Sequence, residues 1–283
     1  MISREAAEQN LSRSPGDAVF LALYFGSHKI PAAICFLLRA SESAIRSAVI
    51  GVWLGLLTPG LMRKLDIWYY TRGDPMYRSP DYNRSGLFDW EEEAVNTWFA
   101  KSSSVLIAAG AGAGREILAL NRRGICAEGF ECNPALVQLG NSLLSEEGCA
   151  PSIFPAPANE LPAGSEQYDG AIVGWAAYTL IAGKAARIAL LQQIRSRCAP
   201  GSPILLSFFH RSGNTPFYRI STLIANSIRT LLRRPKLEMG DTLSVYFAHR
   251  FTEQEIADEL TASGFKPAFY KTTPYAHAVG IAV

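Results

Sequence analysis

Three glycines stand in five positions between an apolar stretch and a helix-like stretch, in VLIAAGAGAGREILAL (residues 105–120). Because glycine has no Cβ, Gly110, Gly112 and Gly114 allow backbone to come close to another group. Glu131 follows at the end of the next apolar stretch. A carboxylate there can accept two hydrogen bonds from the hydroxyls of a ribose. The three glycines and Glu131 together therefore predict a site for a nucleoside.

Two other uses of a glycine-rich loop fit the spacing poorly. A phosphate-binding loop of the form GxxxxGK[ST] needs glycine where Arg115 stands, followed by lysine. The dinucleotide fingerprint GxGxxG needs a small residue at the same position, because the helix packs on the strand there. Arg115 is too large for either pattern. We therefore expect a nucleoside that carries no pyrophosphate.

The elements that must position these residues alternate after about residue 100, where apolar strand-like runs take turns with helix-like runs. The last two runs are separated only by a turn at Pro274, too short for a parallel crossover, so they must be antiparallel neighbours. The pattern predicts an α/β fold, a doubly wound and mostly parallel sheet with one hairpin edge. The expected strands are 104–109, 126–131, 151–154, 169–175, 203–209, 265–272 and 276–283.

The first hundred residues are typical of helices. Asp17 and Pro31 are expected to begin two of them, and Ser41 or Ser43 a third that runs toward Leu57. We expect residues 1–100 to form a helical cap or lid, 101–283 the sheet domain, and 211–248 an insertion that could cover a substrate. The uncharged run 47–62 is shorter than the roughly 20 apolar residues of a membrane span. A buried core helix is favoured, with membrane association as the alternative.

Charge and cysteine content narrow the class of protein. The net charge of +2 argues against a nucleic-acid binder, which usually carries a clear basic excess. The five cysteines include no CxxC pair and no two histidines have metal-ligand spacing, so we infer no disulfide framework and no metal. The N-terminal residues are polar and mixed in charge, unlike a secretory signal peptide. These features lead us to expect a cytoplasmic protein.

Five segments, taken in order, resemble the class I S-adenosylmethionine-dependent methyltransferases: VLIAAGAGAGR, AEGFECNP, YDGAIVGW, IRSRCAPGSPILLSFF and FTEQEIADELTASGF. The resemblance covers residues 104–283. It implies a seven-stranded Rossmann-like sheet in the order 3-2-1-4-5-7-6 with an antiparallel last strand. It also implies S-adenosylmethionine as the cofactor. The sequence departs from the family at Ala108, where an acidic residue is common. It also departs after the third strand, where Pro157 stands at the usual place of an aspartate and only Asn159 and Glu160 lie nearby.

The resemblance implies transfer of a methyl group to an oxygen or nitrogen of a small molecule. Beyond the carboxyl ends of the strands we expect Trp175 to line the cofactor and His210 to act as a general base if the acceptor arrives protonated. The residues expected to bind the cofactor are Gly110, Gly112, Gly114, Glu131, Asn159 and Trp175. Those expected to bind the substrate are Tyr69, Tyr70, Tyr77, Tyr82 and Tyr178.

Several alternatives stay open at this stage. The same fold can transfer an aminopropyl group, although the GWAAYTL stretch after the fourth strand lacks the acidic residues that would hold a polyamine. A non-catalytic nucleoside-binding or membrane-associated module would also fit, as would a fold that binds nothing. The apolar N-terminal helices leave room for a homodimer or a peripheral membrane contact.

Overall fold

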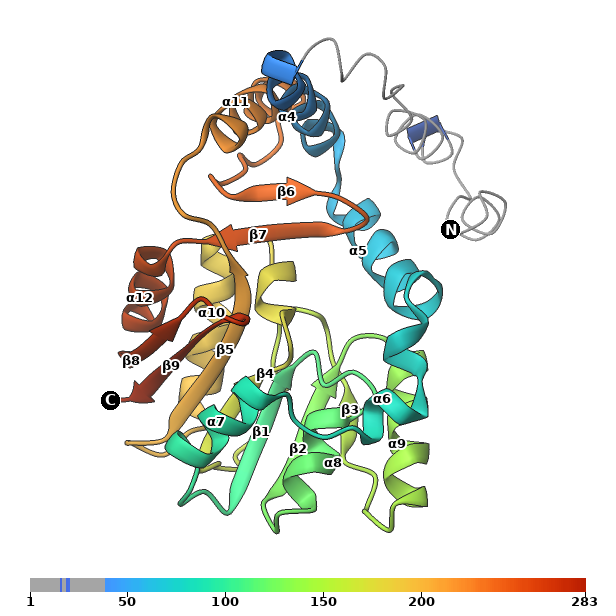
Figure 1. The fold of residues 1–283 in the computed structure, drawn as a ribbon, viewed down its shortest axis with the longest axis vertical. Coiled ribbons are helices and arrows are strands. Elements are labelled where there is room, and N and C mark those ends of the chain that lie inside the picture. Colours follow the sequence, from blue (N-terminus) through green and yellow to red (C-terminus); the bar gives the residue numbers. More distant parts are fainter. Residues whose placement is uncertain (1–15, 17–18, 21–38) are drawn as a thin grey trace. The chain divides into compact units, whose positions relative to one another are not determined.

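The computed structural model describes residues 16, 19–20 and 39–283 (Figure 1). It divides the chain into two compact units. Unit 1 comprises residues 1–73 and 211–249, and unit 2 comprises 74–210 and 250–283. Apart from residues 19–20 and 39–40, the two helices expected after Asp17 and Pro31 lie outside the described residues.

The centre of unit 2 is a sheet of five parallel strands in the order β3-β2-β1-β4-β5. The chain's last strand runs antiparallel along β5, and β8 runs antiparallel to that last strand. When the two strands to which the 211–248 insertion contributes are left out, β8 is the sixth strand and the chain's last strand is the seventh. The order is then the predicted 3-2-1-4-5-7-6. The strands are β1 (Ser104–Ala109), β2 (Cys126–Glu131), β3 (Ile153–Pro155), β4 (Gly170–Val173), β5 (Pro203–His210), β8 (Phe265–Lys271) and β9 (Ala276–Ala282).

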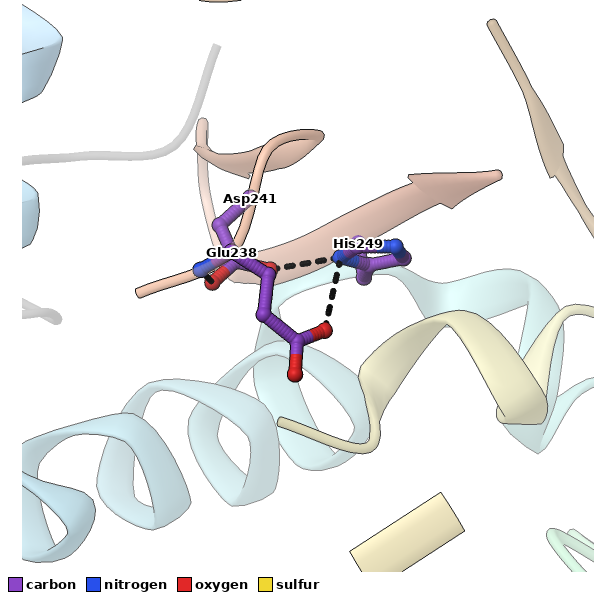
Figure 2. Close-up of side chains that lie close together, drawn as sticks. All are labelled: Glu238, Asp241 and His249. Atoms are coloured by element: carbon purple, nitrogen blue, oxygen red, sulfur yellow. Dashed lines mark hydrogen bonds and ion pairs between the residues drawn. The ribbon is translucent and has the colours of Figure 1, made fainter. Parts of the chain in front are cut away.

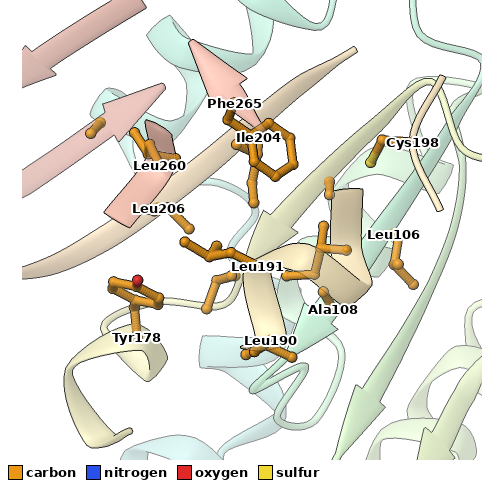
Figure 3. Packing of buried hydrophobic residues seen from close by; sticks show 14 of the residues in the cluster. Leu106, Ala108, Tyr178, Leu190, Leu191, Cys198, Ile204, Leu206, Leu260 and Phe265 are labelled. Atoms are coloured by element: carbon orange, nitrogen blue, oxygen red, sulfur yellow. The ribbon is translucent and has the colours of Figure 1, made fainter. Parts of the chain in front are cut away.

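Helices cover both faces of this sheet, because successive side chains of a strand point to opposite faces. Leu106 and Ala108 of β1 belong to a core with Leu190 and Leu260 of two helices (Figure 3). The alternate residues of β1 belong to a second core, on the other face. The helices of unit 2 are α6 (Pro80–Arg84), α7 (Asp89–Trp98), α8 (Arg115–Asn121), α9 (Pro134–Glu146), α10 (Lys184–Ser196) and α12 (Glu253–Ala262).

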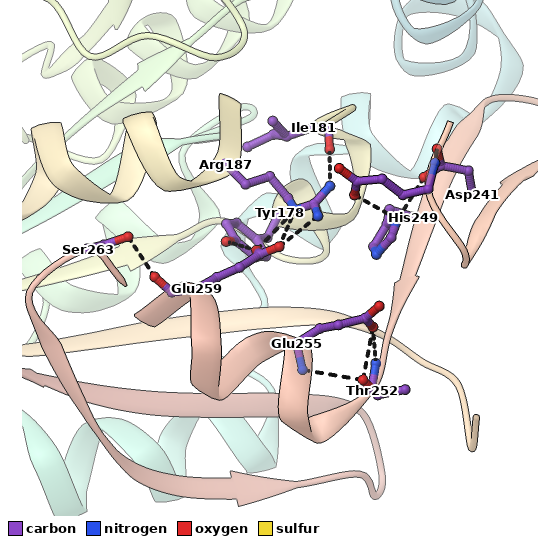
Figure 4. Close-up of polar contacts among 10 residues, drawn as sticks. Tyr178, Ile181, Arg187, Asp241, His249, Thr252, Glu255, Glu259 and Ser263 are labelled. Carbon is purple, nitrogen blue, oxygen red and sulfur yellow. Dashed lines mark hydrogen bonds and ion pairs between the residues drawn. The ribbon is translucent and has the colours of Figure 1, made fainter. Parts of the chain in front are cut away.

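Local sequence signals fix several helix starts in unit 2. The side chain of Asn133 accepts a hydrogen bond from the backbone N–H of Ala135, and Pro134 is the first residue of α9. Thr252 and Glu255 form a capping box at the start of α12 (Figure 4). These signals are short-range, because each joins residues two or three positions apart.

Unit 1 joins the N-terminal helices to the 211–248 insertion. Gly51 and Gly55 allow the first described helix to pack closely on the insertion's helix: a Cβ would lie 2.7 Å from the carbonyl oxygen of Ser221 and 2.8 Å from Cβ of Ile228, respectively. The elements are α4 (Arg39–Leu56), α5 (Pro59–Trp68), a π-helix (Tyr69–Gly73), α11 (Pro216–Leu231), β6 (Asp241–Leu243) and, from unit 1 into unit 2, β7 (Phe247–Phe251).

Three features of this arrangement differ from the sequence-based expectations. The helix expected to begin at Ser41 or Ser43 already includes both, since α4 begins at Arg39. The expected boundary near residue 100 falls inside unit 2, because Trp90 and Phe99 pack in the second core with the sheet. The insertion groups with the N-terminal helices and not with the sheet.

A helix that crosses a membrane must be long and apolar enough to span the bilayer. Among the described helices, none is by itself long and apolar enough to cross a membrane. Residues 44–56 and 59–73 meet the criterion only as a pair that is bent by 110°.

Candidate cofactor-binding site

The loop after β1 holds its three glycines in the left-handed region, with φ of 67° at Gly110, 57° at Gly112 and 87° at Gly114. The space beside each one differs. A Cβ at Gly112 would meet no atom within 4 Å, whereas at Gly110 it would lie 2.5 Å from Cβ of Ala177. At Gly114 it would lie 3.0 Å from Cδ1 of Ile153. A side chain at Gly110 or Gly114 would therefore meet protein, whereas the space beside Gly112 is open.

Glu131, the last residue of β2, points its carboxylate at this loop. Oε2 accepts a hydrogen bond from the backbone N–H of Gly112, and Oε1 accepts one from that of Asn133, each at 2.8 Å. The side chain is buried, and burial raises the pKa of Glu131 although the two backbone hydrogen bonds oppose that rise. Hydrogen bonds from Cys132 also oppose the rise in the pKa of this carboxylate.

The turn after β4 approaches the same loop. A Cβ at Gly174 would overlap the carbonyl oxygen of Gly110, so only glycine fits there. Ala176 adopts a left-handed conformation with φ of 56°, and its N–H donates to Oγ of Ser207 at 2.8 Å. Left-handed non-glycine residues cost free energy and cluster at functional sites. The sequence did not single out Gly174 or Ala176, since only the fold brings β4 against the β1 loop.

Trp175 lies in a group of aromatic side chains, which we call the aromatic group: Tyr77, Tyr82, Phe88, Trp175 and Tyr275. The ring centroid of Trp175 is 5.1 Å from that of Phe88, 5.4 Å from Tyr275 and 6.4 Å from Tyr77. Tyr77 and Tyr82 are 6.0 Å apart. The structure therefore brings together three of the predicted ligand-binding residues and adds Phe88 and Tyr275, which sequence reasoning missed.

Arg115, the residue that excluded two other loop types, is fully buried at the start of α8. Its guanidinium forms hydrogen bonds of 2.6 and 2.7 Å with the two carboxylate oxygens of Glu91, and another of 2.8 Å with Glu116. The ring of Phe88 lies 4.1 Å from the guanidinium carbon, within cation–π range. Arg115 thereby ties the segment before β1 to the glycine loop.

The charges of this cluster depend on one another. Burial alone lowers the pKa of Arg115, but the charges of Glu116 and Glu91 outweigh it and raise that pKa. Burial raises the pKa of Glu91, and the hydrogen bonds from Arg115 oppose the rise. Burial also raises the pKa of Tyr82, which keeps its phenol protonated. A cation shared by two carboxylates is the arrangement that makes burial of these charges tolerable.

Tyr178, expected to bind substrate, is a core residue instead. Its ring is fully buried and stacks on Phe251 at 5.2 Å. Its hydroxyl donates to Oε2 of Glu259 at 2.5 Å, and the guanidinium of Arg187 binds the same carboxylate (Figure 4). The expectation that Tyr178 binds substrate is therefore corrected. A hydroxyl buried in the core needs a hydrogen-bond partner, and Glu259 is that partner.

His210 ends β5, at the edge of the sheet where β1, β2 and β4 also end. Its Nδ1 lies 2.9 Å from the hydroxyl of Tyr270, and the side chain is half-buried. Burial raises the pKa of Tyr270 to about 12, so that hydroxyl stays protonated at neutral pH. The hydrogen bond with Tyr270 orients the His210 ring.

The remaining predicted residues lie in different places. Asn159 lies in a turn after β3, and it is exposed to solvent. Tyr69 and Tyr70 belong to unit 1, where their rings lie 4.8 and 6.1 Å from that of Tyr246. With Tyr246 they form an aromatic cluster within unit 1.

Glu238, Asp241 and His249 bring their ligand-type atoms within 4.8 Å of one another in unit 1 (Figure 2). Nδ1 of His249 lies 2.6 Å from Oδ1 of Asp241. Two ligands of a zinc or magnesium ion, each about 2.0–2.1 Å from the metal, stand about 3 Å apart. The shorter separation indicates a hydrogen-bonded His249–Asp241 pair.

Comparison with known proteins supports the fold. No family model and no curated protein sequence matches the chain. Among solved structures, it resembles a SAM-dependent methyltransferase from Methanosarcina mazei, with 18% identity, a TM-score of 0.53 and coverage of 69% of this chain and 96% of that one. It also resembles a 1,6-didemethyltoxoflavin-N1-methyltransferase from Burkholderia thailandensis, with 17% identity and a TM-score of 0.54. That match covers 80% of this chain and 91% of the other. The chain therefore has the fold of SAM-dependent methyltransferases.

Proposed function

We propose that this protein transfers a methyl group from S-adenosylmethionine to an oxygen or nitrogen of a small molecule. One observation carries the proposal: the carboxylate of Glu131 lies beside the open backbone at Gly112, at the carboxyl edge of a parallel sheet. Ligands of open α/β sheets bind at that edge. A ribose diol can hydrogen-bond to the carboxylate of Glu131, and the missing Cβ of Gly112 leaves space for the ligand.

Each group of residues has a distinct part in the proposed reaction. When bound, S-adenosylmethionine supplies a methyl group on a positively charged sulfur. Glu131 holds the ribose and Gly112 admits it, while Trp175 and its aromatic neighbours provide an apolar wall that excludes water. His210, oriented by Tyr270, takes the proton that an O–H or N–H acceptor loses, at the ring nitrogen Nε2.

A small-molecule acceptor is the substrate class that we propose. The Burkholderia relative acts on 1,6-didemethyltoxoflavin and another relative, from Micromonospora echinaspora, is an amino pentose methyltransferase. The aromatic group offers flat apolar surface of the kind that binds ring compounds.

Calorimetry with S-adenosylmethionine and S-adenosylhomocysteine tests the proposal directly. We expect both to bind, and Glu131→Ala to lose about 1.5–3 kcal/mol of binding free energy, the range for a hydrogen bond to a charged group. Glu128→Ala is the matched control, because Glu128 lies on the same strand and accepts from Tyr168 instead. Failure of both compounds to bind the wild-type protein would refute the proposal.

A further inference from the structure

Positive charge is concentrated in unit 1. Its described parts, residues 39–73 and 211–249, contain eleven Lys and Arg but four Asp and Glu. The whole chain contains 27 and 25. The excess is therefore local, and the rest of the chain is net acidic. A charge asymmetry of this size between parts of a chain indicates an anionic partner.

Exposed leucines lie at one end of the same unit. Leu231 is 83% exposed and Leu232 is 42% exposed, at the C-terminal end of α11. Leu56, at the C-terminal end of α4, is 37% exposed. A single exposed apolar side chain is ordinary, but exposed apolar side chains that lie together mark interaction surfaces.

Hydrogen bonds hold these two helix ends together. The guanidinium of Arg234 donates to the carbonyl oxygen of Leu56 at 2.8 Å. That of Arg229, which is buried, donates to the carbonyl oxygens of Leu54 and Leu57. α4 and α11 also run in the same direction, since Gly51 meets Ser221 and Gly55 meets Ile228. The exposed leucines of both helices therefore belong to one surface.

Exposed cations flank this surface. Arg233 directly follows Leu232 after the end of α11, and Lys236 lies three positions further along the chain. Both are exposed. We call the five residues Leu56, Leu231, Leu232, Arg233 and Lys236 the basic tip. Apolar side chains beside Lys and Arg are the combination that inserts into the interface of an anionic bilayer, with the leucines in the acyl boundary and the cations at the head groups.

We propose that unit 1 docks on an anionic lipid bilayer through the basic tip. A nucleic acid would use the cations but gain nothing from two adjacent exposed leucines, whereas a bilayer uses both. This inference does not depend on the proposed methyl transfer, because it concerns a different surface.

Co-sedimentation of the full chain with vesicles tests the proposal. We expect binding to vesicles of equal parts phosphatidylglycerol and phosphatidylcholine, weak binding to phosphatidylcholine alone, and release as salt is raised. Leu231→Ser/Leu232→Ser and Arg233→Glu/Lys236→Glu should each reduce the partition coefficient by about tenfold or more. Both pairs are exposed, so thermal unfolding should remain close to that of the wild type.

A double variant of unit 2, Val283→Ser/Lys266→Glu, is the control, because it removes one exposed apolar residue and one exposed cation elsewhere. It should bind vesicles as the wild type does. Equal binding by all three variants would overturn the proposal. So would tight binding to duplex DNA that survives the serine substitutions, or a dimer in sedimentation velocity that only those substitutions dissociate while vesicle binding is unchanged.

Discussion

The guanidinium of Arg115 forms two parallel hydrogen bonds with the carboxylate of Glu91, and both side chains are almost completely buried. Arg115 opens the helix after the glycine loop, and Glu91 lies in the helix before β1. The N–H of Phe88 also donates to Glu91. One carboxylate therefore fixes the start of α7 and the position of α8 together, and with them the loop that we propose binds the cofactor.

Arg115→Met should destabilise the protein by about 3–5 kcal/mol, because it leaves the carboxylates of Glu91 and Glu116 buried without their cation. Adding Glu91→Leu should recover part of the loss, since a buried apolar pair needs no compensation. Urea unfolding measures the free energies. Arg123→Met is the control, as Arg123 pairs with an exposed Glu92 and should cost at most about 1 kcal/mol. Equal losses for the two arginine variants would contradict this assignment.

Gly110→Ala and Gly112→Ala should separate stability from binding. Both place a side chain in the left-handed region, at about 1–2 kcal/mol. Gly110→Ala should cost more, because its Cβ meets Ala177, and the double variant Gly110→Ala/Ala177→Gly should remove the excess. Gly112→Ala should weaken S-adenosylhomocysteine binding instead. Thermal unfolding and calorimetry, read together, check both; unchanged affinity in Gly112→Ala would place the ligand elsewhere.

Cofactor affinity should fall on acidification at a pH above the usual carboxyl range. Burial raises the pKa of Glu131 in the free protein above the usual value of 4.5. Only the ionised carboxylate accepts hydrogen bonds at both oxygens, so binding is complete above the raised pKa and is lost as pH falls through it. Calorimetry with S-adenosylhomocysteine from acid to neutral pH measures the profile. Glu131→Gln should bind weakly with no such dependence; the same slope in that variant would rule out Glu131 as the titrating group.

Tyr178→Phe and Trp175→Ala should have opposite effects. Tyr178→Phe removes the buried hydroxyl that donates to Glu259 and should cost about 1.5–3 kcal/mol of stability, with cofactor affinity unchanged. Trp175→Ala should weaken ligand binding more than stability, because the side chain is only half-buried. Urea unfolding and calorimetry on both variants decide. A large loss of affinity in Tyr178→Phe with normal stability would restore its predicted role at the substrate.

Asp66, in α5, should make the protein less stable as pH rises. Burial raises the pKa of Asp66 to about 7, from 3.8, and its Oδ1 has no hydrogen-bond partner among the described residues. The folded state therefore holds a proton that the unfolded state releases, so stability falls as pH rises from about 4 to 7. Asp66→Asn should flatten this part of the stability profile. Melting temperatures across that range test it, and identical slopes for the two proteins would refute it.

The sequence by itself determined the features that depend on neighbouring residues. The apolar run before the glycines predicted β1, and the turn before the last strand predicted an antiparallel pair. Thr252 and Glu255, three positions apart, form the capping box that begins α12. Periodicity and capping involve side chains a few positions apart, which the sequence displays directly. The order of strands followed from the family resemblance, and the structure confirms it.

Only the tertiary structure decided what the long-range contacts are. Arg115 was an oversized residue in the sequence, and the fold pairs it with a carboxylate 24 positions earlier. The backbone of Gly114 lies close to Ile153, and the hydroxyl of Tyr178 binds Glu259 in the core. The basic tip joins α4 to the end of α11, far apart in the chain. Such contacts are set by packing, because two faces become neighbours only when the sheet and the helices have assembled.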